Sequence, residues 1–281
     1  MPNKKNNERN MRMKLLGLSL LATVFLASCT GGKGVPSCQL PGYQLVWNDE
    51  FDQGSTPDPD RWVYQEAKAG WVNNELQTYV KGASPEGRPV AEVKDGKLLI
   101  HCFAEGDKVY SGRLYGNRNE GWTYGYVEAR IKLPAGKGTW PAFWMMPVRF
   151  TAWPDDGEID IMEEVGCNPN YVSSSLHAKG HYHVENTQVT HECFLEGAEG
   201  DFHVYAMEWT KDYIQTYVDG EKQLYYANDG SGKRNWPYDS PFYVILNLAW
   251  GGNWGGMNGV DPTALPITME VDYVRVYQKN K

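Results

Sequence analysis

The sequence predicts an all-β fold, a sandwich or a barrel, built as one large domain. From Tyr43 onward, short β-prone segments recur with Gly, Asn, Asp and Pro between them. We find no long amphipathic helix, internal repeat or low-complexity tract in the chain. A chain of 281 residues is also within the length at which all-β domains still fold around one core. We therefore expect one core and no second domain.

Two Asp-Gly pairs predict tight hairpins. They lie at 95–96 and 219–220, and each separates two short β-prone segments. Asp-Gly tolerates the positive φ angles that a two-residue type I′ turn requires. Each pair therefore fixes the register of two antiparallel strands.

Four longer segments are typical of strands. Residues 126–133 and 214–218 alternate between two kinds of side chain, as expected for strands with one solvated face. Residues 242–248 are almost continuously apolar, which predicts a strand buried on both faces. Residues 267–277 form the last expected strand.

The composition favours a neutral partner. With 27 Lys and Arg against 35 Asp and Glu, the formal net charge is −8, which argues against nucleic acid or another polyanion. The chain also carries 11 Trp. Tryptophan fills the cores of sandwiches, and beside acidic residues it also stacks on sugar rings, so composition leaves both interpretations open.

The N-terminus has the pattern of an export signal. A basic stretch precedes the apolar run 15–27, which is too short to span a membrane comfortably, and Leu-Ala-Ser-Cys29 follows. This motif resembles the bacterial lipobox, which implies a signal peptide over 1–28, lipidation of Cys29, a tether over 29–40 and the folded domain over 41–281. We expect an outer-membrane lipoprotein at the cell surface, with a periplasmic orientation left open.

Four further cysteines follow Cys29. An even number in an exported protein permits disulfides, but four cysteines allow three pairings and the sequence does not choose among them. Buried free thiols are an equally fair interpretation. The four are Cys38, Cys102, Cys167 and Cys193.

One β-prone segment is crowded with carboxylates. Residues 156–164 read Asp-Gly-Glu-Ile-Asp-Ile-Met-Glu-Glu. The two-residue period of a strand places Glu158 and Asp160 on one face. Glu163 joins them only if the strand contains one extra residue, so we predict a β-bulge near 161–162.

This crowding indicates chemistry. Buried carboxylates cost free energy unless they are paired, protonated or used. Retaining glycoside hydrolysis needs two carboxyl groups about 5–5.5 Å apart, whereas a straight strand would separate the Cα atoms of Glu158 and Glu163 by about 13 Å. Their side chains must therefore lean together. The alternative is a solvated acidic edge strand, but the apolar Ile159, Ile161 and Met162 indicate a buried opposite face.

Several motifs together resemble glycoside hydrolase family 16, in its bulged, laminarinase-like and lichenase-like branch of endo-β-glucanases. The catalytic-strand motif Gly-Glu-Ile-Asp-Ile-Met-Glu at 157–163 follows Gly-Thr-Trp-Pro-Ala-Phe-Trp-Met-Met-Pro at 138–147. The resemblance extends over essentially the whole chain after the signal. Further matching segments lie at 46–51, 74–79, 124–134, 247–253 and 271–277.

The resemblance implies a β-jelly-roll sandwich of the concanavalin A-like lectin and glucanase type, with a concave cleft for a glucan. It implies Glu158 as the nucleophile, Glu163 as the general acid/base and Asp160 as a group that holds or shares a proton. Trp140 and Trp144 should line the cleft and stack on glucose rings, with core packing as the alternative for either.

Five more residues are candidates for sugar contacts. Trp250 lies in a motif of the glucanase branch, and His177 should reach the cleft near the general acid/base. The other three candidates are Asn73, Arg118 and Trp254.

The resemblance also implies a structural calcium site far from the cleft, formed by Glu50, the carbonyl oxygen of Gly96 and Asp272. Carboxylate and backbone oxygens suit calcium, but a purely structural role of these residues is an equal alternative. The histidines of 177–183 suggest zinc at first sight, yet no further ligands are evident and we do not favour it. The chemistry itself requires no cofactor.

The predicted function is therefore a retaining endo-β-glucanase that acts on mixed-linkage β-1,3-1,4-glucan, laminarin or both. We expect a monomer that touches the membrane through its lipid alone. One alternative is a non-catalytic cell-surface glycan-binding protein, although all three carboxylates are present. Another is a family 16 enzyme that acts on a galactan, which the acidic chain disfavours if the galactan is sulfated. The loops 180–200 and 228–239 should frame the cleft and set its specificity.

Overall fold

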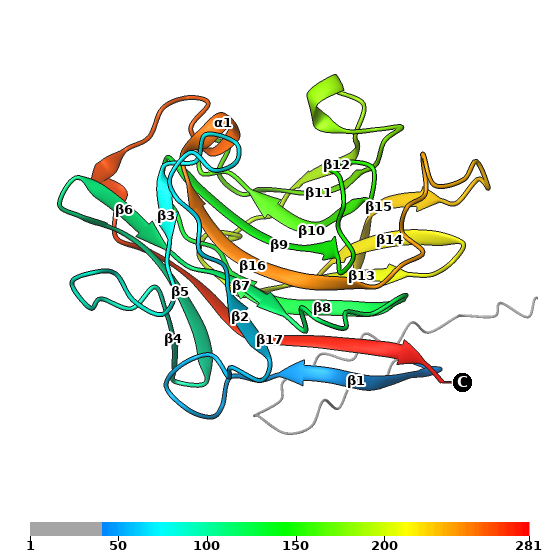
Figure 1. Cartoon of the computed structure of the whole chain (residues 1–281), viewed down its shortest axis with the longest axis horizontal. Helices are drawn as coiled ribbons and strands as arrows, with labels where there is room; N and C mark the ends of the chain where they lie inside the picture. Colours follow the sequence, from blue (N-terminus) through cyan, green and yellow to red (C-terminus); the bar gives the residue numbers. More distant parts are fainter. Residues whose placement is uncertain (1–40, 281) are drawn as a thin grey trace, which may run out of the picture. The chain divides into compact units, whose positions relative to one another are not determined.

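The computed structural model describes residues 41–280, which form two β-sheets packed face to face (Figure 1). The predicted signal peptide and tether, with Cys29 and Cys38, lie outside these residues. Within 41–280, no helix has the length and apolar character needed to cross a membrane.

The larger sheet has ten strands. Eight of them follow one another across the sheet, while β1 (Tyr43–Asp49) pairs with β17 and β4 (Ala91–Lys94) pairs with β5. In spatial order the eight are β15 (Glu221–Ala227), β14 (Tyr213–Val218), β13 (His203–Trp209), β8 (Gly125–Lys132), β17 (Ile267–Lys279), β5 (Lys97–Glu105), β6 (Lys108–Ser111) and β3 (Gln77–Tyr79).

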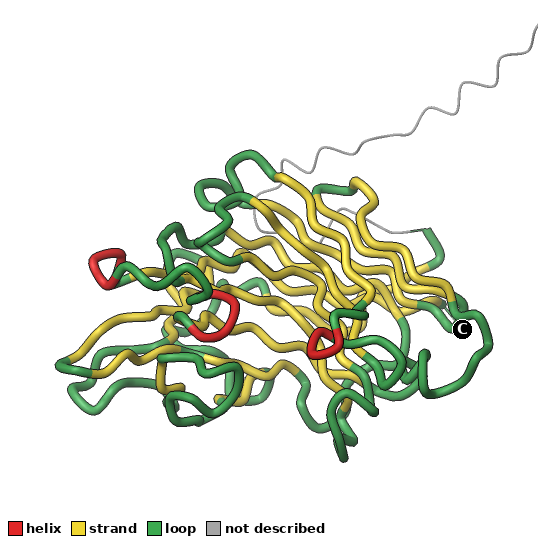
Figure 2. Tube along the Cα trace, turned by 90° about the horizontal axis from the view of Figure 1, so that it is seen from above, coloured by secondary structure: helices red, strands yellow, loops and turns green. Residues whose placement is uncertain are grey.

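The smaller sheet has seven strands, with the carboxylate strand near its middle. In spatial order they are β12 (Val189–Phe194), β11 (Tyr171–His177), β10 (Glu158–Glu164), β9 (Thr139–Pro147), β16 (Phe242–Trp250), β7 (Arg113–Gly116) and β2 (Trp62–Tyr64). Three short helical turns interrupt the loops (Figure 2): η1 (His183–Glu185), α1 (Gly252–Gly255) and η2 (Pro262–Ala264).

The core lies between the two sheets. Phe143 and Leu246 of the smaller sheet and Ile131 and Val274 of the larger one are fully buried there. Because neighbouring side chains of a strand point to opposite faces, the other face of the smaller sheet is left to line a cleft. The two packed sheets form the sandwich that the sequence predicts.

The local predictions are confirmed. Both Asp-Gly pairs form tight turns with positive φ angles, 51° and 68° at 95–96 and 51° and 84° at 219–220. The apolar segment 242–248 lies in β16, all of whose residues are buried. Cys102, Cys167 and Cys193 are free thiols; Cys102 is buried, as the second interpretation held, whereas Cys167 and Cys193 are partly exposed.

Candidate active site

The predicted bulge is present in β10. Three alternate residues of β11 face Glu158, Asp160 and Glu163, and the register shifts between Asp160 and Glu163. The facing residues are His177, Ser175 and Ser173. Since alternate residues of one strand share a face, the three carboxylates lie on one face of β10, and the extra residue at 161–162 makes this possible.

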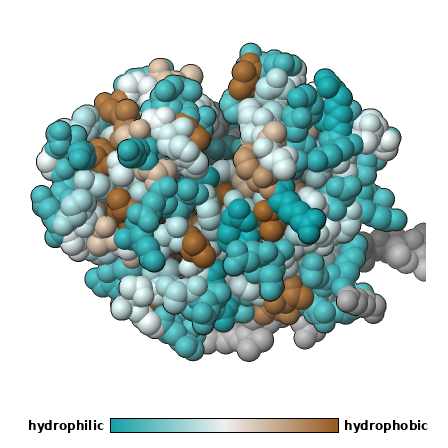
Figure 3. All heavy atoms as spheres, viewed as in Figure 1, coloured by the Kyte–Doolittle hydropathy of each residue, from teal (hydrophilic) through white to brown (hydrophobic). Residues whose placement is uncertain are grey.

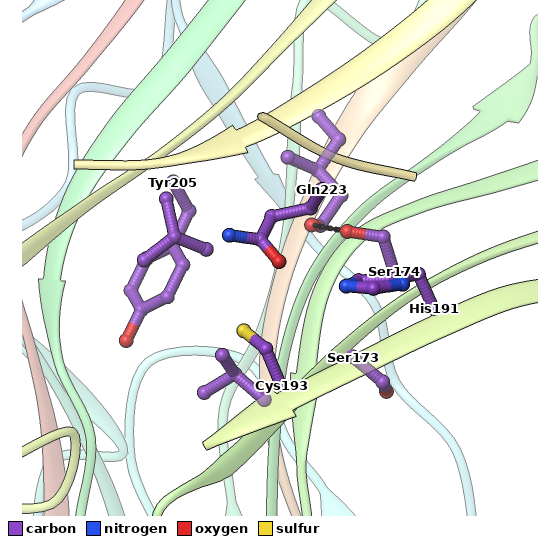
Figure 4. A pocket seen from close by; sticks show the side chains of 9 residues that line it. Ser173, Ser174, His191, Cys193, Tyr205 and Gln223 are labelled. Atoms are coloured by element: carbon purple, nitrogen blue, oxygen red, sulfur yellow. Dashed lines mark hydrogen bonds between the residues drawn. The ribbon is translucent and has the colours of Figure 1, made fainter. Parts of the chain in front are cut away.

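Ser174 supports the bulge from the core side. A bulge leaves backbone groups without their ladder partners. The Ser174 hydroxyl donates to the carbonyl oxygen of Ile161 at 2.8 Å. Figure 4 shows this bond in a small pocket between the sheets, where Tyr205, Cys193 and Gln223 also line the space. The carboxylate strand therefore has its distortion fixed by a side chain that never reaches the cleft.

Each carboxylate of the cleft face has its own nitrogen contact. Trp153 Nε1–H donates to Glu158 Oε2 at 2.9 Å, and Trp140 Nε1–H donates to Glu163 Oε1 at 3.0 Å. His177 Nε2 lies 3.1 Å from Asp160 Oδ2 and 4.0 Å from Glu158 Oε1. These contacts fix the orientations of the three acids.

Burial raises the pKa of all three carboxyl groups. It raises the pKa of Glu158 to about 7, and the charge of Asp160 adds to this, while His177 and the Trp153 hydrogen bond oppose it. Burial and the neighbouring Asp160 raise the pKa of Glu163 well above its ordinary range. Burial also raises the pKa of Asp160. Burial therefore favours the protonated form of all three carboxyl groups, and their neighbouring charges couple the protonation of one to that of the others.

Trp140 and Trp144 lie on the cleft face, as predicted. Trp140 reaches Glu163, and Trp144 is paired with Asp160 across the strands. The Trp144 Nε1–H also donates to Asn247 Oδ1 at 2.7 Å. A floor of indole rings therefore adjoins the carboxylates.

Three of the weaker candidates also lie at this cleft. Trp254 in α1 packs edge-on against Trp140, with ring centroids 5.4 Å apart. Asn73 Nδ2 approaches Glu75 Oε1 at 3.4 Å. The Arg118 guanidinium lies 4.3 Å from the centroid of Tyr243, which shares a face of β16 with Asn247.

The prediction for Trp250 is wrong. Its side chain is 1% exposed and belongs to the core between the sheets. The alternation along β16 places Asn247 toward the cleft and Trp250 toward the core. Within this motif the cleft residue is therefore Asn247 and not Trp250.

His177 is in the cleft, but at the other carboxylate. The prediction placed it near Glu163, whereas the pairing of β11 with β10 sets it opposite Glu158. Among residues 41–280, the one cluster of three His, Cys, Asp or Glu groups with metal-ligand spacing joins His177 to Glu158 and Asp160, with ligand atoms within 4.8 Å of one another. His181 instead contacts the Tyr238 hydroxyl at 3.3 Å. We assign no metal to this cluster, because its groups already contact one another.

Sequence reasoning missed Trp153, Arg113 and Glu75. Trp153 lies in the loop between β9 and β10 and reaches Glu158. Arg113 is buried with its guanidinium 4.7 Å from the Trp144 centroid. The Glu75 carboxylate is buried and accepts from Gln77 Nε2 at 2.6 Å. Glu75 could have been found from the sequence, because it lies in the segment 74–79 that matches the family.

The cleft is visible as a hollow in the surface. Figure 3 shows it between the part that carries α1 and the part that carries η1, above β9, β10 and β16. The hollow thus lies over the carboxylates and the indole rings just described.

The residues predicted for calcium fit a cation poorly. Strand pairing brings Glu50, Gly96 and Asp272 to one region of the larger sheet. Arg275, however, donates to both Glu50 carboxylate oxygens at 2.9 and 2.8 Å, and Arg130 donates to Asp272 at 2.8 Å. Both carboxylates have cationic partners, so calcium would have to displace at least one of them.

A cluster of carboxylates beside indole rings on the cleft face of a sheet is typical of a glycoside hydrolase. Residues 93–275 match the sequence model of Glycosyl hydrolases family 16, and the chain belongs to this family. Catalysis in this family needs no cofactor.

Known proteins of this family resemble the chain over most of its length. It is 44% identical over 254 residues to a beta-glucanase of Rhodothermus marinus, which covers 86% of this chain and 87% of that protein. The laminarinase structure of Rhodothermus marinus has a TM-score of 0.80 at 43% identity, covering 85% of this chain and 98% of that one. SCLam, a non-specific endo-beta-1,3(4)-glucanase solved as a Glu-to-Ser variant with 1,3-beta-D-cellotriosyl-glucose, has a TM-score of 0.79 at 43% identity and covers 88% and 97%.

Proposed function

We propose that this protein is a retaining endo-β-glucanase that hydrolyses β-1,3-containing glucans, both laminarin and mixed-linkage glucan. The bulge in β10, which brings Glu158, Asp160 and Glu163 to one face of the cleft, is the observation that carries this proposal. The similar β-glucanase, laminarinase and endo-β-1,3(4)-glucanase support the substrate class.

In the first step Glu163 acts as the acid and Glu158 as the nucleophile. Glu163 gives its proton to the glycosidic oxygen, the bond from that oxygen to C1 breaks, and a Glu158 oxygen forms a bond to C1. The raised pKa of Glu163 keeps the proton available, and the Trp153 hydrogen bond and His177 favour the ionised form of Glu158. The product is a covalent glycosyl-enzyme and a free reducing-end fragment.

In the second step Glu163 acts as the base. Its carboxylate takes a proton from water, the water oxygen bonds to C1, and the ester bond to Glu158 breaks. Two inversions at C1 return the original anomer. Asp160, beside Glu158 and His177, shares the proton load while these charges change.

The indole rings orient the chain for this chemistry. Trp140 and Trp144 offer apolar faces to sugar rings, while their N–H groups already bind Glu163 and Asn247. The rings are thereby fixed before the substrate arrives, which lowers the entropic cost of binding.

Release of oligosaccharides from laminarin, barley mixed-linkage glucan, cellulose and agarose by the purified protein tests the proposal. We expect short oligosaccharides from both β-1,3-containing glucans. Cleavage of agarose alone would favour a galactanase. Retention on a glucan column without cleavage of any polymer would favour the binding-protein alternative.

We infer that the chain is exported and anchored through a lipid on Cys29, after removal of 1–28. The lipobox-like sequence supports this, and 29–40 would then link the lipid to the domain over 41–281. Radiolabelled palmitate should enter the wild-type protein and not Cys29→Ser. Digestion of intact cells with protease should remove the protein if it faces the cell exterior, as we propose, and should spare it if it faces the periplasm.

Calcium plays no part in this mechanism, and the two arginine pairs argue against the calcium site that the sequence predicts. We expect the same thermal unfolding temperature in EDTA and in calcium chloride. A rise on adding calcium would instead support calcium bound near Asp272. We also propose that the protein is a monomer. Light scattering of the domain over 41–281 in solution without detergent measures its molar mass and tests this.

A further inference from the structure

Asp156 is a buried carboxylate in the loop that carries Trp153. This loop, residues 148–157, joins β9 to β10 and ends next to the proposed nucleophile. Asp156 is 7% exposed, and its Oδ2 accepts from the Thr151 N–H and hydroxyl, both at 2.6 Å, and from the Ala152 N–H at 3.0 Å. These three donors hold the start of the loop against its end, because hydrogen bonds to a charged acceptor are roughly twice as strong as neutral ones.

The loop also closes through its backbone on both sides of Trp153. Asp156 N–H donates to the Ala152 carbonyl, and Gly157 N–H donates to the Pro154 carbonyl, each at 3.1 Å. Ala152 and Pro154 flank Trp153 in the sequence, so the chain on each side of the tryptophan is bound to the end of the loop. The Trp153 Nε1–H in turn donates to the carboxylate of the nucleophile at 2.9 Å.

A second loop holds Asp156 from the other side. Lys233 lies in the loop 228–241 between β15 and β16, and its Nζ donates to Asp156 Oδ1 at 2.8 Å. This ion pair joins the second loop to the turn that carries Trp153. The Lys233 side chain is 69% exposed, so water screens the pair, and we expect it to contribute less than the three bonds inside the turn.

A third segment packs against the ring of Trp153. The ring centroid lies 5.6 Å from that of Tyr182 and 5.0 Å from that of His183. Gly180 N–H donates to the Arg234 carbonyl at 2.8 Å, which ties this segment to the loop that pairs with Asp156. The indole is therefore held at its ring by one loop and at its backbone by the turn that Asp156 closes.

The charge of Asp156 and its hydrogen bonds would act on the nucleophile in opposite directions. Burial alone would raise the pKa of Asp156, but hydrogen bonds from Lys233 and Thr151 hold it below its ordinary value, so Asp156 is ionised at neutral pH. A nearby negative charge raises the pKa of a carboxyl group, whereas the Trp153 N–H lowers that of Glu158. Loss of Asp156 would thus lower the pKa of Glu158 if only charge mattered, and raise it if Trp153 lost its place.

We propose that Asp156 is a positioning residue, which holds Trp153 within hydrogen-bonding reach of Glu158 and so orients the nucleophile. This inference rests on the proposed function and adds a residue that acts through Trp153 and not on the substrate. The alternative is that Asp156 only stabilises the loop, which would lower the unfolding temperature of a variant without moving its pH profile.

The test measures kcat and KM on laminarin against pH for the purified full-length wild type, Asp156→Ala, Asp156→Asn and Asp155→Ala. For Asp156→Ala we expect about five- to tenfold lower kcat at the optimum, KM within about twofold, and an acidic limb of kcat/KM about half a pH unit higher. Asp156→Asn keeps an acceptor oxygen for the turn and should restore most of kcat and the position of the limb. Asp155→Ala is the matched control, because Asp155 pairs with Lys179 at 2.9 Å at an exposed site, and it should behave as the wild type.

Two more variants separate positioning from stability. In a Trp153→Phe background there is no N–H to position, so adding Asp156→Ala should cost less than about a further twofold in kcat. Lys233→Met should move the acidic limb in the same direction as Asp156→Ala but by less, because only the screened ion pair is lost. Further groups that act on the charge of Glu158 are unchanged in every variant, namely Asp160, His177 and Arg113.

An acidic limb that stays in place or moves to lower pH in Asp156→Ala would overturn the proposal. An undiminished loss of kcat on adding Asp156→Ala to Trp153→Phe would overturn it as well. If the wild type cleaves no β-glucan at all, the proposed function fails and the inference fails with it. A wild type that cleaves laminarin, together with an unmoved profile in Asp156→Ala, refutes the inference alone.

Discussion

The two faces of the seven-stranded sheet use the same residue types in opposite ways. On the cleft face, Trp144 donates to Asn247 and Glu158 accepts from Trp153. On the core face, Trp250 is packed among apolar side chains and Glu164 is completely buried. The face of the strand therefore decides whether a tryptophan or a glutamate can take part in chemistry.

The carboxylates show how the cost of burial is met on each face. On the cleft face, burial raises the pKa of Glu158 and Glu163, while indole N–H groups and His177 oppose this rise. On the core face, burial and the neighbouring Glu199 raise the pKa of Glu164 to about 9. Glu164 thus avoids a buried charge by keeping its proton, whereas the cleft acids remain able to exchange theirs.

The largest contrast is expected between Glu158→Gln and Glu164→Gln. Loss of the nucleophile should lower kcat by at least about 10³-fold, because no covalent intermediate can form. Glu164→Gln should stay within about threefold of the wild type. Rates on laminarin check both, and binding of the Glu158→Gln protein to a glucan column controls for folding. Substantial activity in Glu158→Gln, or loss of activity in Glu164→Gln alone, would show that the chemistry does not take place on the cleft face.

The two tryptophans should separate stability from activity. Trp250→Ala should lower the free energy of unfolding by about 3–5 kcal/mol, since it empties a large volume in the core. Trp144→Ala should cost much less stability but about 10–100-fold in kcat/KM, because it removes a stacking surface and exposes Arg113. Urea unfolding and initial rates measure the two effects. Similar stability losses in both variants would contradict the assignment of Trp144 to the cleft.

Removing the indole donors should shift the pH profile in a defined direction. The Trp153 hydrogen bond lowers the pKa of Glu158, so Trp153→Phe should raise it. The nucleophile must be ionised, and the acidic limb of kcat/KM should therefore move to higher pH, with about a tenfold loss at the optimum. Trp140→Phe should move the alkaline limb upward instead, because Trp140 lowers the pKa of Glu163.

Profiles of kcat/KM against pH test this pair of variants together. An unmoved acidic limb in Trp153→Phe would show that the hydrogen bond to Glu158 does not control its protonation.

The smallest effect per pH unit is expected in the pH dependence of stability. Glu164 keeps its proton in the folded protein up to about pH 9, whereas its ordinary pKa is 4.5. Between these values the unfolded chain binds fewer protons, so stability falls as pH rises, by at most about 1.4 kcal/mol per pH unit for one group. Glu164→Gln should flatten this slope between pH 5 and about 9, which urea unfolding at several pH values measures. An equally steep slope in the variant would place the effect in the cleft acids.

The fold and the catalytic strand could be predicted from the sequence, because both depend on local patterns. The Asp-Gly turns are set by backbone conformation at two residues each. The bulge follows from spacing, since Glu163 can share a face with Glu158 only through an extra residue.

Other features depend on contacts that no local pattern records. Apart from Asn247, β16 is apolar, so its sequence shows almost no alternation that would place Trp250 in the core. The position of His177 depends on the register between β10 and β11. Trp153 reaches Glu158 from a loop, and Trp71 meets Arg113 only because distant segments are neighbours in the folded sheet.

The anomeric form of the first product tests the central claim most directly. NMR spectra recorded within the first minutes of hydrolysis separate the α- and β-anomers before mutarotation mixes them. The two-step mechanism with Glu158 and Glu163 predicts that the β-anomer appears first. Early appearance of the α-anomer would mean a single inverting displacement by water, and Glu158 could not then be the nucleophile.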